Sequence, residues 1–398
     1  MTTTDTRYLN TVSPTELERR WALVRSHMRA AGLDALVVQN SSDWVGGHIR
    51  WFSNEPATNG YPSTLVFAAA GGMTRIEQGP FGNVRETRDE QRAATGITRV
   101  RTTPSYPSVG YTGTYDADLA IDELRLIGAR RVGLVAPAAM YYSFGNRLIA
   151  ALPGAEFEDA TDMVDLLKAR KSPEEQSLIR RVATMQDQVM RAVAAFIKPG
   201  LRDFEVAAYA QYVGQQLGSE QGIFLCSSAP PGRAASFQPR SRQGRRIERG
   251  DTFSLLVENN GAGGFYTELS RIFVLGKPSP ALRAAHAEVL EAQRFALGLL
   301  VPGTPCREIF ARHNAYLRER GLAEERRLSI HGMGYDMVER PLIRDDEDML
   351  LAEDMVIVVH PGILNEAMFV HNTEVYLVTQ DGPPECLHAT PRELIEIS

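Results

Sequence analysis

Cysteine, long apolar runs and an excess of positive charge are scarce or missing in this sequence, and each lack excludes a class of protein. Only three cysteines occur in 398 residues. Cys226, Cys306 and Cys386 are too scattered for a disulfide framework, so we expect reduced, buried thiols. No apolar run approaches the roughly 20 residues that span a bilayer, and the first ten residues lack the pattern of a signal peptide. We therefore expect a cytoplasmic protein without a membrane partner.

Positive charge is in deficit, because 43 Lys and Arg against 49 Asp and Glu give a net charge of -6. Nucleic-acid binding usually requires a basic face, so we do not expect nucleic acid as a partner. What the chain does have is the balance of a folded protein, with 43% hydrophobic and 23% charged residues. Its length suits two domains of ordinary size.

The first part of the chain alternates between helical and strand-like patterns. Apolar residues at helical spacing predict helices over 13–32 and 117–127. Short apolar runs predict four strands, at 33–38, 64–68, 98–101 and 131–136. This alternation indicates an α/β domain over residues 1–165.

A boundary follows this domain. Ser172 is a typical N-cap residue, Pro173 suits the first helical turn, and two glutamates come next. A long helix should therefore run to about Ile197, and it opens a second domain over residues 166–398.

The second domain contains an internal repeat with an offset of 103 residues. Pro199-Gly200 aligns with Pro302-Gly303, and the strand pattern at 252–257 aligns with the one at 355–360. Each copy reads as helix, Pro-Gly turn, helix and strands. Two such copies should pack about a pseudo-twofold axis, with a ligand cleft between them.

Glu258, Glu268 and His360 each stand at the end of an apolar strand pattern in this repeat. Such groups are costly to bury unless they are paired, hydrogen-bonded or bound to a metal. At the offset of 103, His360 is the repeat mate of Val257, and His371 is the mate of Glu268. We therefore expect polar groups from both halves to converge on one cleft.

His331 opens the motif His-Gly-Met-Gly-Tyr, whose glycines let the backbone approach a ligand closely. Because His360 and two glutamates lie in the same domain, we interpret His331 as a ligand or acid–base group and not as a structural histidine. The candidate catalytic residues are Glu268, His331, Tyr335 and His360.

These motifs resemble the superfamily of creatinase, aminopeptidase P, prolidase and methionine aminopeptidase. The resemblance is carried by the strand pair at 250–273, the motifs at His331 and at His360-Pro-Gly-Ile, and the last strand at 375–382. It implies an α/β pita-bread domain with a pseudo-twofold repeat, preceded by a smaller creatinase-type α/β domain. It also implies an enzyme that forms a homodimer and acts on a small molecule.

The sequence departs from this superfamily at the metal ligands. The metallopeptidases of the superfamily hold two metal ions with two Asp, one His and two Glu. Here Glu258 and Glu268 stand at or beside the Asp positions and His331 keeps the histidine, but the two Glu positions have become His360 and Thr373. His371 and Glu374 lie close to Thr373 in the sequence. The candidate metal ligands are Glu258, Glu268, His331, His360, His371 and Glu374.

Charge limits the metal content that this resemblance implies. Four carboxylates neutralise two divalent cations, whereas two glutamates with neutral histidines suit one. A mixed imidazole and carboxylate set favours Fe, Zn, Ni, Cu or Mn over Mg. The alternative is a metal-free site, because creatinase works without metal.

Further candidates could bind substrate. His48, Arg50 and Trp51 stand where creatinase-like proteins place residues that reach the partner subunit's site, and Tyr61 follows. A polar pair among aromatic residues suits a small charged ligand, although a strand edge with a solvated arginine is the alternative. Phe237 lies where the superfamily has a further histidine that this sequence lacks.

We expect a creatinase-like hydrolase that cleaves a C–N or related bond of a small, non-peptide substrate. The second hypothesis is an Xaa-Pro aminopeptidase-like metallopeptidase, which is disfavoured because His360 and Thr373 replace two carboxylates. A lyase resembling dimethylsulfoniopropionate lyases, with a histidine or tyrosine base, is the third. A non-catalytic binding protein is the fourth.

Overall fold

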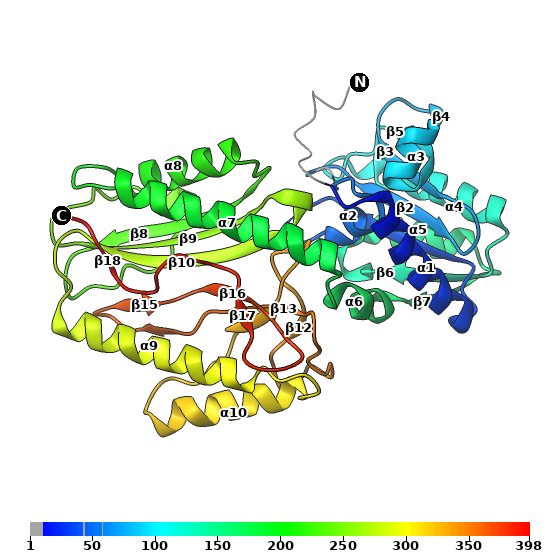
Figure 1. Cartoon of the computed structure of the whole chain (residues 1–398). Coiled ribbons are helices and arrows are strands. Elements are labelled where there is room, and N and C mark those ends of the chain that lie inside the picture. Colours follow the sequence, from blue (N-terminus) through cyan, green and yellow to red (C-terminus); the bar gives the residue numbers. More distant parts are fainter. Residues whose placement is uncertain (1–10, 43, 58) are drawn as a thin grey trace. The chain divides into compact units, whose positions relative to one another are not determined.

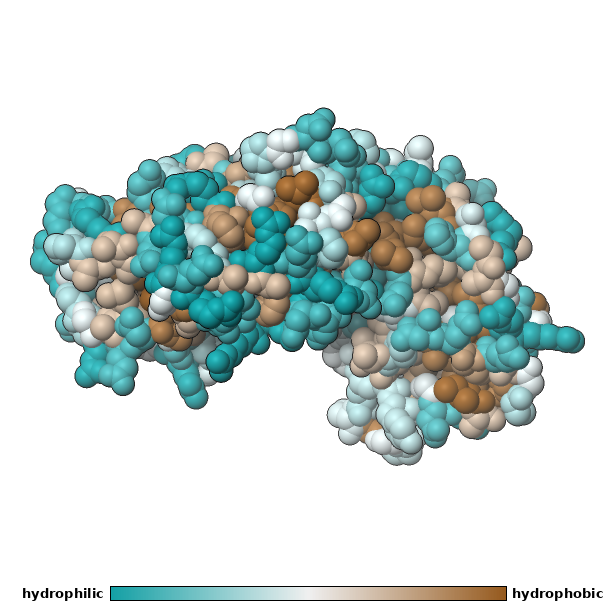
Figure 2. All heavy atoms as spheres, turned by 90° about the horizontal axis from the view of Figure 1, so that it is seen from below, coloured by the Kyte–Doolittle hydropathy of each residue, from teal (hydrophilic) through white to brown (hydrophobic). Residues whose placement is uncertain are grey.

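The computed structural model describes residues 11–42, 44–57 and 59–398, which form two compact units (Figure 1). The first unit extends to Lys168 and the second begins at Ala169. None of the described helices is long and apolar enough to cross a membrane. Hydrophilic residues cover much of the face that Figure 2 displays.

The first unit is built on one mixed sheet with the strand order β4-β5-β3-β2-β1-β6-β7. Its strands are β1 (Ala35–Asn40), β2 (Ser63–Ala68), β3 (Met73–Gln78), β4 (Val84–Glu86), β5 (Ile97–Thr103), β6 (Arg131–Val135) and β7 (Glu156–Asp159). Its helices are α1 (Pro14–Ala31), α2 (Gly47–Ser53), α3 (Asp89–Thr95), α4 (Tyr115–Ile127), α5 (Tyr142–Ala151) and α6 (Thr161–Ala169), with short 3-10 turns η1 (Gly110–Thr112) and η2 (Pro137–Ala139).

Local signals and core packing explain these elements. Helix α1 begins after Ser13, whose hydroxyl accepts a hydrogen bond from the Glu16 backbone N–H at 3.2 Å. The predicted helices are confirmed as α1 and α4, and the four predicted strands as β1, β2, β5 and β6. Strand β3 was not predicted, because Arg75 and Glu77 interrupt its apolar pattern and instead form an ion pair at 3.0 Å.

The second unit contains two larger sheets, with the strand orders β18-β10-β9-β8 and β12-β11-β13-β16-β17, and the pair β14-β15. Its strands are β8 (Gly222–Ala229), β9 (Thr252–Asn260), β10 (Tyr266–Val274), β11 (Ile330–Gly332), β12 (Glu339–Leu342), β13 (Val356–Val359), β14 (Gly362–Leu364), β15 (Phe369–His371), β16 (Glu374–Leu377), β17 (Glu385–Cys386) and β18 (Ile395–Glu396). Its helices are α7 (Pro173–Phe196), α8 (Asp203–Gln216), α9 (Pro280–Leu299) and α10 (Cys306–Glu319), with 3-10 turns η3 (Arg240–Arg242) and η4 (Ala262–Gly264).

The helices of the second unit flank its sheets in two pairs. Figure 1 shows α7 and α8 along one side of the strands and α9 and α10 along the other. The predicted start of α7 is confirmed, because the Ser172 hydroxyl and the Glu175 carboxylate form a reciprocal capping box. Apolar residues of α9 and α10, such as Ala296 and Ile309, pack with Ile357 of β13 in one buried cluster.

The internal repeat is visible in equivalent structural positions. Helices α8 and α10 begin and end 103 residues apart. Gly200 and Gly303 both adopt positive φ, at 99° and 88°, a conformation that favours glycine. At the junction of the halves, Ser270 pairs directly with its repeat mate Thr373, and their hydroxyl oxygens lie 2.7 Å apart. A residue that contacts its own mate marks the position of a pseudo-twofold axis.

Strands β9 and β10 extend further than their sequence patterns predict, so both glutamates lie inside strands and not at strand ends. Two buried asparagines continue β9. The Asn259 side chain accepts a hydrogen bond from Gln186 at 2.8 Å, and Asn260 accepts bonds from the backbone of Glu220 and Gln221 at 3.0 Å. Satisfied in this way, polar residues can occupy buried strand positions that an apolar pattern cannot indicate.

Candidate active site

A pocket of about 500 Å³ lies in the second unit and is lined by residues of both repeat halves. Strands β9 and β10 supply Glu258 and Glu268, whereas β11, β15 and the residue after β13 supply three histidines. The histidines are His331, His371 and His360. The structure therefore brings these five predicted residues to the same pocket.

Glu258 and Glu268 stand directly opposite each other on the antiparallel strands β9 and β10. Their exposed fractions are only 6% and 7%. Burial raises the pKa of both carboxyl groups, the charge of Glu268 raises that of Glu258 further, and the guanidinium of Arg327 opposes both effects. Like charges at directly opposed strand positions repel each other, so this pair calls for a cation or a shared proton.

The His331 ring is held in one tautomer. Its Nδ1 lies 2.9 Å from the backbone carbonyl of Gly332, and since a carbonyl only accepts, Nδ1 carries the proton. Burial, followed by the neighbouring His360, lowers the pKa of His331 to about 3, so the ring is neutral. Its unprotonated Nε2 lies 3.7 Å from a carboxylate oxygen of Glu268. When the Glu268 carboxyl is ionised, two acceptors therefore face each other across this gap.

His360 completes a compact set of ligand atoms. Its ring centroid lies 5.2 Å from that of His331, and burial lowers its pKa to about 4 although the ring keeps some exposure to the pocket. Ligand atoms of Glu268, His331 and His360 all lie within 4.8 Å of one another. Two neutral imidazoles and one carboxylate form a set that suits a divalent transition metal ion such as zinc. A backbone carbonyl bonded to Nδ1 is also the usual outer partner of a metal-binding histidine.

His371 lies in the same pocket but outside this compact set. Its Nδ1 is 2.7 Å from the Ser270 hydroxyl, which in turn donates to Thr373 at 2.7 Å. Phe237 and Phe369 pack against its ring, with centroids 4.5 Å and 4.7 Å away. Burial lowers the pKa of His371 to about 3, so this ring is also neutral. Phe237, a predicted substrate-binding residue, lines the pocket.

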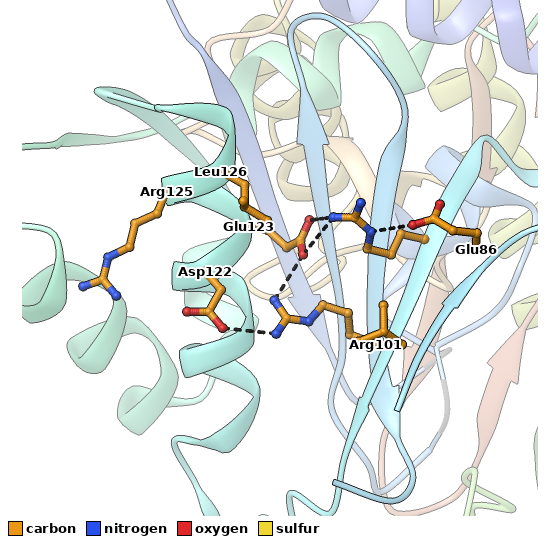
Figure 3. A pocket seen from close by; sticks show the side chains of 8 residues that line it. Glu86, Arg101, Asp122, Glu123, Arg125 and Leu126 are labelled. Carbon is orange, nitrogen blue, oxygen red and sulfur yellow. Dashed lines mark hydrogen bonds and ion pairs between the residues drawn. The ribbon is translucent and has the colours of Figure 1, made fainter. Parts of the chain in front are cut away.

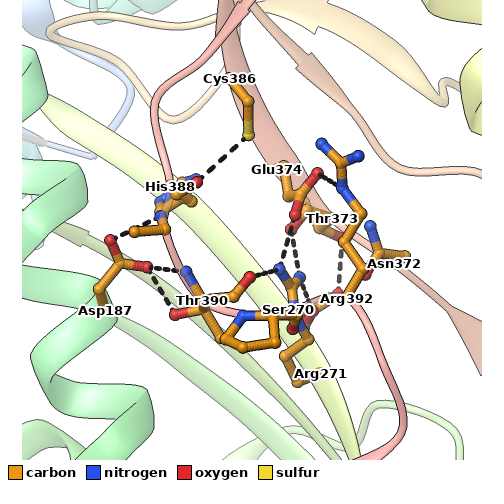
Figure 4. A network of polar contacts seen from close by, with 12 residues as sticks. Asp187, Ser270, Arg271, Asn372, Thr373, Glu374, Cys386, His388, Thr390 and Arg392 are labelled. Carbon is orange, nitrogen blue, oxygen red and sulfur yellow. Dashed lines mark hydrogen bonds and ion pairs between the residues drawn. The ribbon is translucent and has the colours of Figure 1, made fainter.

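Glu374, by contrast, is not brought to the pocket as the predicted ligand set requires. Its carboxylate accepts hydrogen bonds from Arg271 at 2.6 Å and Arg392 at 2.7 Å (Figure 4). Side chains alternate along a strand, so Glu374 points away from the face that Thr373 presents. The network in Figure 4 therefore uses this carboxylate in the structure of the sheet.

Tyr335, a predicted catalytic residue, does not line the pocket. Its ring packs against Phe265 with centroids 4.2 Å apart, and its backbone N–H donates to Glu339 at 2.7 Å. The glycine-rich motif thus brings His331 to the pocket but turns Tyr335 into the core.

The other four substrate-binding candidates, His48, Arg50, Trp51 and Tyr61, belong to the first unit. His48 Nε2 lies 2.9 Å from a carboxylate oxygen of Asp165. Arg50 and Trp51 are buried, at 5% and 2% exposure, in helix α2. The alternative of a strand edge with a solvated arginine is therefore wrong. Tyr61 is exposed at the surface of the first unit.

A second hollow, of about 570 Å³, lies in the first unit beside Arg99, Arg101 and Glu123 (Figure 3). Its charges neutralise one another. Glu123 accepts hydrogen bonds from Arg99 at 3.3 Å and Arg101 at 3.1 Å, and Arg99 also donates to Glu86 at 2.9 Å. With these charges satisfied within the protein, we assign no site there.

Arg327 and Ser270 were not among the candidates of the sequence analysis. Arg327 lines the pocket and was overlooked because a lone arginine in a polar stretch reads as solvated surface. Ser270 orients His371, and its position two residues after Glu268 on the same strand face was a usable signal. Neither residue belongs to a motif with fixed spacing.

The fold and the pocket together define a class of protein, namely an α/β enzyme whose pocket lies between duplicated halves and holds a cluster of histidine and glutamate side chains that could bind a metal ion. Residues 177–380 match metallopeptidase family M24, and the chain belongs to that family. As a member of this metallopeptidase family, the protein is a hydrolase. The superfamily and fold expected from the sequence are confirmed by this match and by solved structures.

Proteins that are similar to this chain in sequence or structure include peptidases of several organisms. An Xaa-Pro dipeptidase of Pyrococcus furiosus is 30% identical over 244 residues, or 60% of this chain and 69% of the relative. An uncharacterized hydrolase/peptidase of Sinorhizobium fredii is 27% identical over 406 residues, or 96% of this chain and 98% of the relative. The structure of an X-Pro aminopeptidase from Thermotoga maritima superposes with a TM-score of 0.77 at 20% identity, covering 96% of this chain and 99% of that one.

Proposed function

We propose that this protein is a metal-dependent hydrolase that cleaves the amide bond of a dipeptide or a similarly small peptide-like substrate. One divalent ion would be held by Glu268, His331 and His360. The observation that carries the proposal is the 3.7 Å approach of the unprotonated Nε2 of His331 to the Glu268 carboxylate. When Glu268 is ionised, two acceptors at this distance in a buried pocket are both satisfied by a cation that binds them.

A single ion fits this donor set better than two. Two neutral imidazoles and one carboxylate are the protein ligands of several catalytic zinc sites, which keep a further position open. A two-ion site would require carboxylates where this chain has His360 and Thr373, and Glu374 is engaged with Arg271. The charge of Glu258 and Glu268 balances one divalent ion.

Different pocket residues would have different roles in the hydrolysis of the amide bond. A divalent ion bound there would polarise the carbonyl group of the scissile bond and lower the pKa of a water molecule. Glu258 faces Glu268 across the strand pair and is placed to accept a proton from that water. Apolar residues, among them Phe237 and Phe369, wall the pocket and exclude bulk water.

The substrate class rests on two supports. Two of the similar proteins are Xaa-Pro dipeptidases, and this favours a peptide-like substrate over the non-peptide substrate that the sequence analysis put first. Of the described residues that line the pocket, Arg327 is the only lysine or arginine, and its guanidinium would bind the free carboxylate of a dipeptide. A pocket of about 500 Å³ suits such a small ligand.

The test is to supply Zn²⁺, Mn²⁺, Co²⁺ or Fe²⁺ to chelator-treated protein and to measure bound metal and the release of proline from Xaa-Pro dipeptides. We expect one ion per chain, and metal-dependent turnover that Glu268→Gln abolishes. The same substitution at exposed Glu319 on α10 is the matched control and should leave both unchanged. Two tightly bound ions per chain, or equal turnover without metal, would refute the proposal.

Three further expectations from the sequence remain proposals of the same kind. The domain limits near residue 165, a cytoplasmic location and a homodimer in which 48–52 lies near the partner's pocket all rest on sequence signals and the resemblance. Light scattering tests the dimer directly, and a monomer at working concentration would count against it.

A further inference from the structure

His371 has an arrangement that metal binding alone does not require. It ends strand β15, is only 4% exposed and lines the pocket. Its Nδ1 is held by Ser270, but among the described residues its buried Nε2 has no hydrogen-bond partner. A buried nitrogen left without a partner is costly unless a ligand or water completes it, so Nε2 is available to a molecule in the pocket.

The hydrogen-bond chain fixes which nitrogen carries the proton. The Ser270 hydroxyl donates to Thr373 at 2.7 Å, so its oxygen accepts the bond from Nδ1–H of His371. Nε2 therefore carries a lone pair that can accept a proton or a hydrogen bond. Contacts with Phe237 and Phe369 hold the plane of the ring.

The pocket thus receives different chemistry from its two halves. Glu268 belongs to the compact ligand set, whereas its repeat mate His371 does not. The duplication has placed a carboxylate at one of two equivalent positions and an oriented imidazole at the other. An imidazole with a fixed tautomer and a free nitrogen toward the substrate is the arrangement that proton transfer uses.

We propose that His371 is a catalytic residue that carries a proton from the attacking water to the nitrogen of the departing amine. This proposal rests on the proposed function, and it assigns to His371 the proton that reaches the amine. As the water oxygen bonds to the carbonyl carbon, Glu258 accepts one water proton, and Nε2 of His371 then accepts the other from the hydroxyl group of the tetrahedral intermediate. As the C–N bond breaks, Nε2 returns this proton to the leaving nitrogen, while Nδ1–H stays bonded to Ser270. The carboxylate product leaves without a proton, and the proton held by Glu258 passes to solvent.

A leaving-group comparison separates this role from a structural one. An amine must be protonated to depart, whereas a 4-nitrophenolate departs without a proton. We therefore expect His371→Asn to lower kcat for an Xaa-Pro dipeptide by about 10²- to 10⁴-fold, the usual size of acid–base catalysis. The loss for the 4-nitrophenyl ester of the same first residue should stay below about tenfold, because only the amine needs the transferred proton. Asparagine can keep the hydrogen bond to Ser270, and His27→Asn on the exposed face of α1 is the matched control.

Metal binding is measured on the same protein samples through the visible absorption of bound Co²⁺. His371→Asn should keep one Co²⁺ per chain with an unchanged spectrum, whereas His331→Asn should lose it. Ser270→Ala serves as a second variant if His371→Asn does not fold, and it should give the same contrast between substrates with a smaller loss. Loss of Co²⁺ from His371→Asn, or equal losses of activity on both substrates, would overturn the catalytic role of His371 and leave the proposed function standing. A wild-type protein that hydrolyses neither substrate with any metal would instead refute the proposed function, and this step with it.

Discussion

Arg271 and Glu374 are repeat mates, 103 residues apart, and they form a buried ion pair in which the guanidinium lies 2.6 Å from the carboxylate. Each side chain is 1% exposed. The pair lies directly beside Ser270 and Thr373, the other mates in contact, so the junction of the two halves carries both a hydroxyl pair and an ion pair. This position explains why Glu374 does not take part in the pocket.

Removing the charge of Glu374 should destabilise the second unit without affecting metal binding. Glu374→Gln leaves the buried Arg271 without its anion, and breaking a buried pair at one partner costs about 3–5 kcal/mol. We expect a loss of this order in the free energy of unfolding, measured by circular dichroism in urea.

The same protein, where it remains folded, should bind one Co²⁺ as the wild type does. Glu385→Gln provides a control, because Glu385 forms an exposed pair with Arg180 and exposed pairs contribute only about 0–1 kcal/mol. A Glu374→Gln protein of normal stability that has lost its metal would identify Glu374 as a ligand after all.

Glu268→Gln should have opposite effects on the metal-bound and the metal-free protein. It removes a ligand, so metal affinity should fall by at least about a hundredfold, beyond what outer-sphere changes cause. In metal-free protein above about pH 8, where the Glu268 carboxyl with its raised pKa is ionised, the substitution also removes one of two like charges that face each other, so the free energy of unfolding should rise by roughly 1 kcal/mol.

Calorimetry of chelator-treated protein measures this rise in the free energy of unfolding. Tryptophan fluorescence would not report on the second unit, because all three tryptophans, Trp21, Trp44 and Trp51, belong to the first unit. Glu319→Gln, the exposed control, should change neither quantity. If metal-free Glu268→Gln is instead less stable than the wild type, the two glutamates share a stabilising proton and the cation argument loses its support.

The first unit should lose stability as pH rises through the range in which Asp116 ionises. Burial raises the pKa of Asp116 to about 6 from its usual 3.8, although Ser105 and Gln39 donate hydrogen bonds to it. Between about pH 4 and 6 the folded form therefore binds more protons than the unfolded form, and its stability decreases with pH. Relative to the wild type, Asp116→Asn should gain about 2–3 kcal/mol between pH 4 and 7.

Tryptophan fluorescence in urea follows this gain, because the fluorophores and Asp116 belong to the same unit. Asp118→Asn, on the same helix but half-exposed beside Arg147, should follow the wild-type profile. Parallel pH profiles for Asp116→Asn and the wild type would contradict the prediction.

Local signals made part of this structure readable from the sequence. The capping residues of α7 and the offset of 103 were sufficient to predict one long helix and the duplication, because both depend on residues close together or regularly spaced. His360 and His371 followed from their repeat positions, and His331 from its glycine-rich motif. By contrast, the choice between His371 and Glu374 depended on which face of a strand meets the pocket, and a one-residue shift reverses that face.

The features that the sequence did not predict depend on tertiary contacts. The segment 47–53 forms helix α2 around buried Arg50 and Trp51, although an arginine among aromatic residues gives no clear local preference. Arg327 reaches the pocket from a stretch without regular structure, where no periodicity applies. Residues of this kind become functional candidates only when their neighbours in space are known.

Arg327 should determine the preference for substrates with a free carboxylate. Its neighbour Arg326 is also exposed but does not line the pocket, so Arg327→Gln and Arg326→Gln form a matched pair. A hydrogen bond to a charged group contributes about 1.5–3 kcal/mol, so kcat/KM of Arg327→Gln for an Xaa-Pro dipeptide should fall by about 10- to 100-fold. The corresponding dipeptide amide lacks the carboxylate, and its lower kcat/KM should be nearly the same in wild type and variant. Arg326→Gln should behave as the wild type on both substrates. If Arg327→Gln loses activity equally on the dipeptide and its amide, the guanidinium acts on the site as a whole and does not bind the carboxylate.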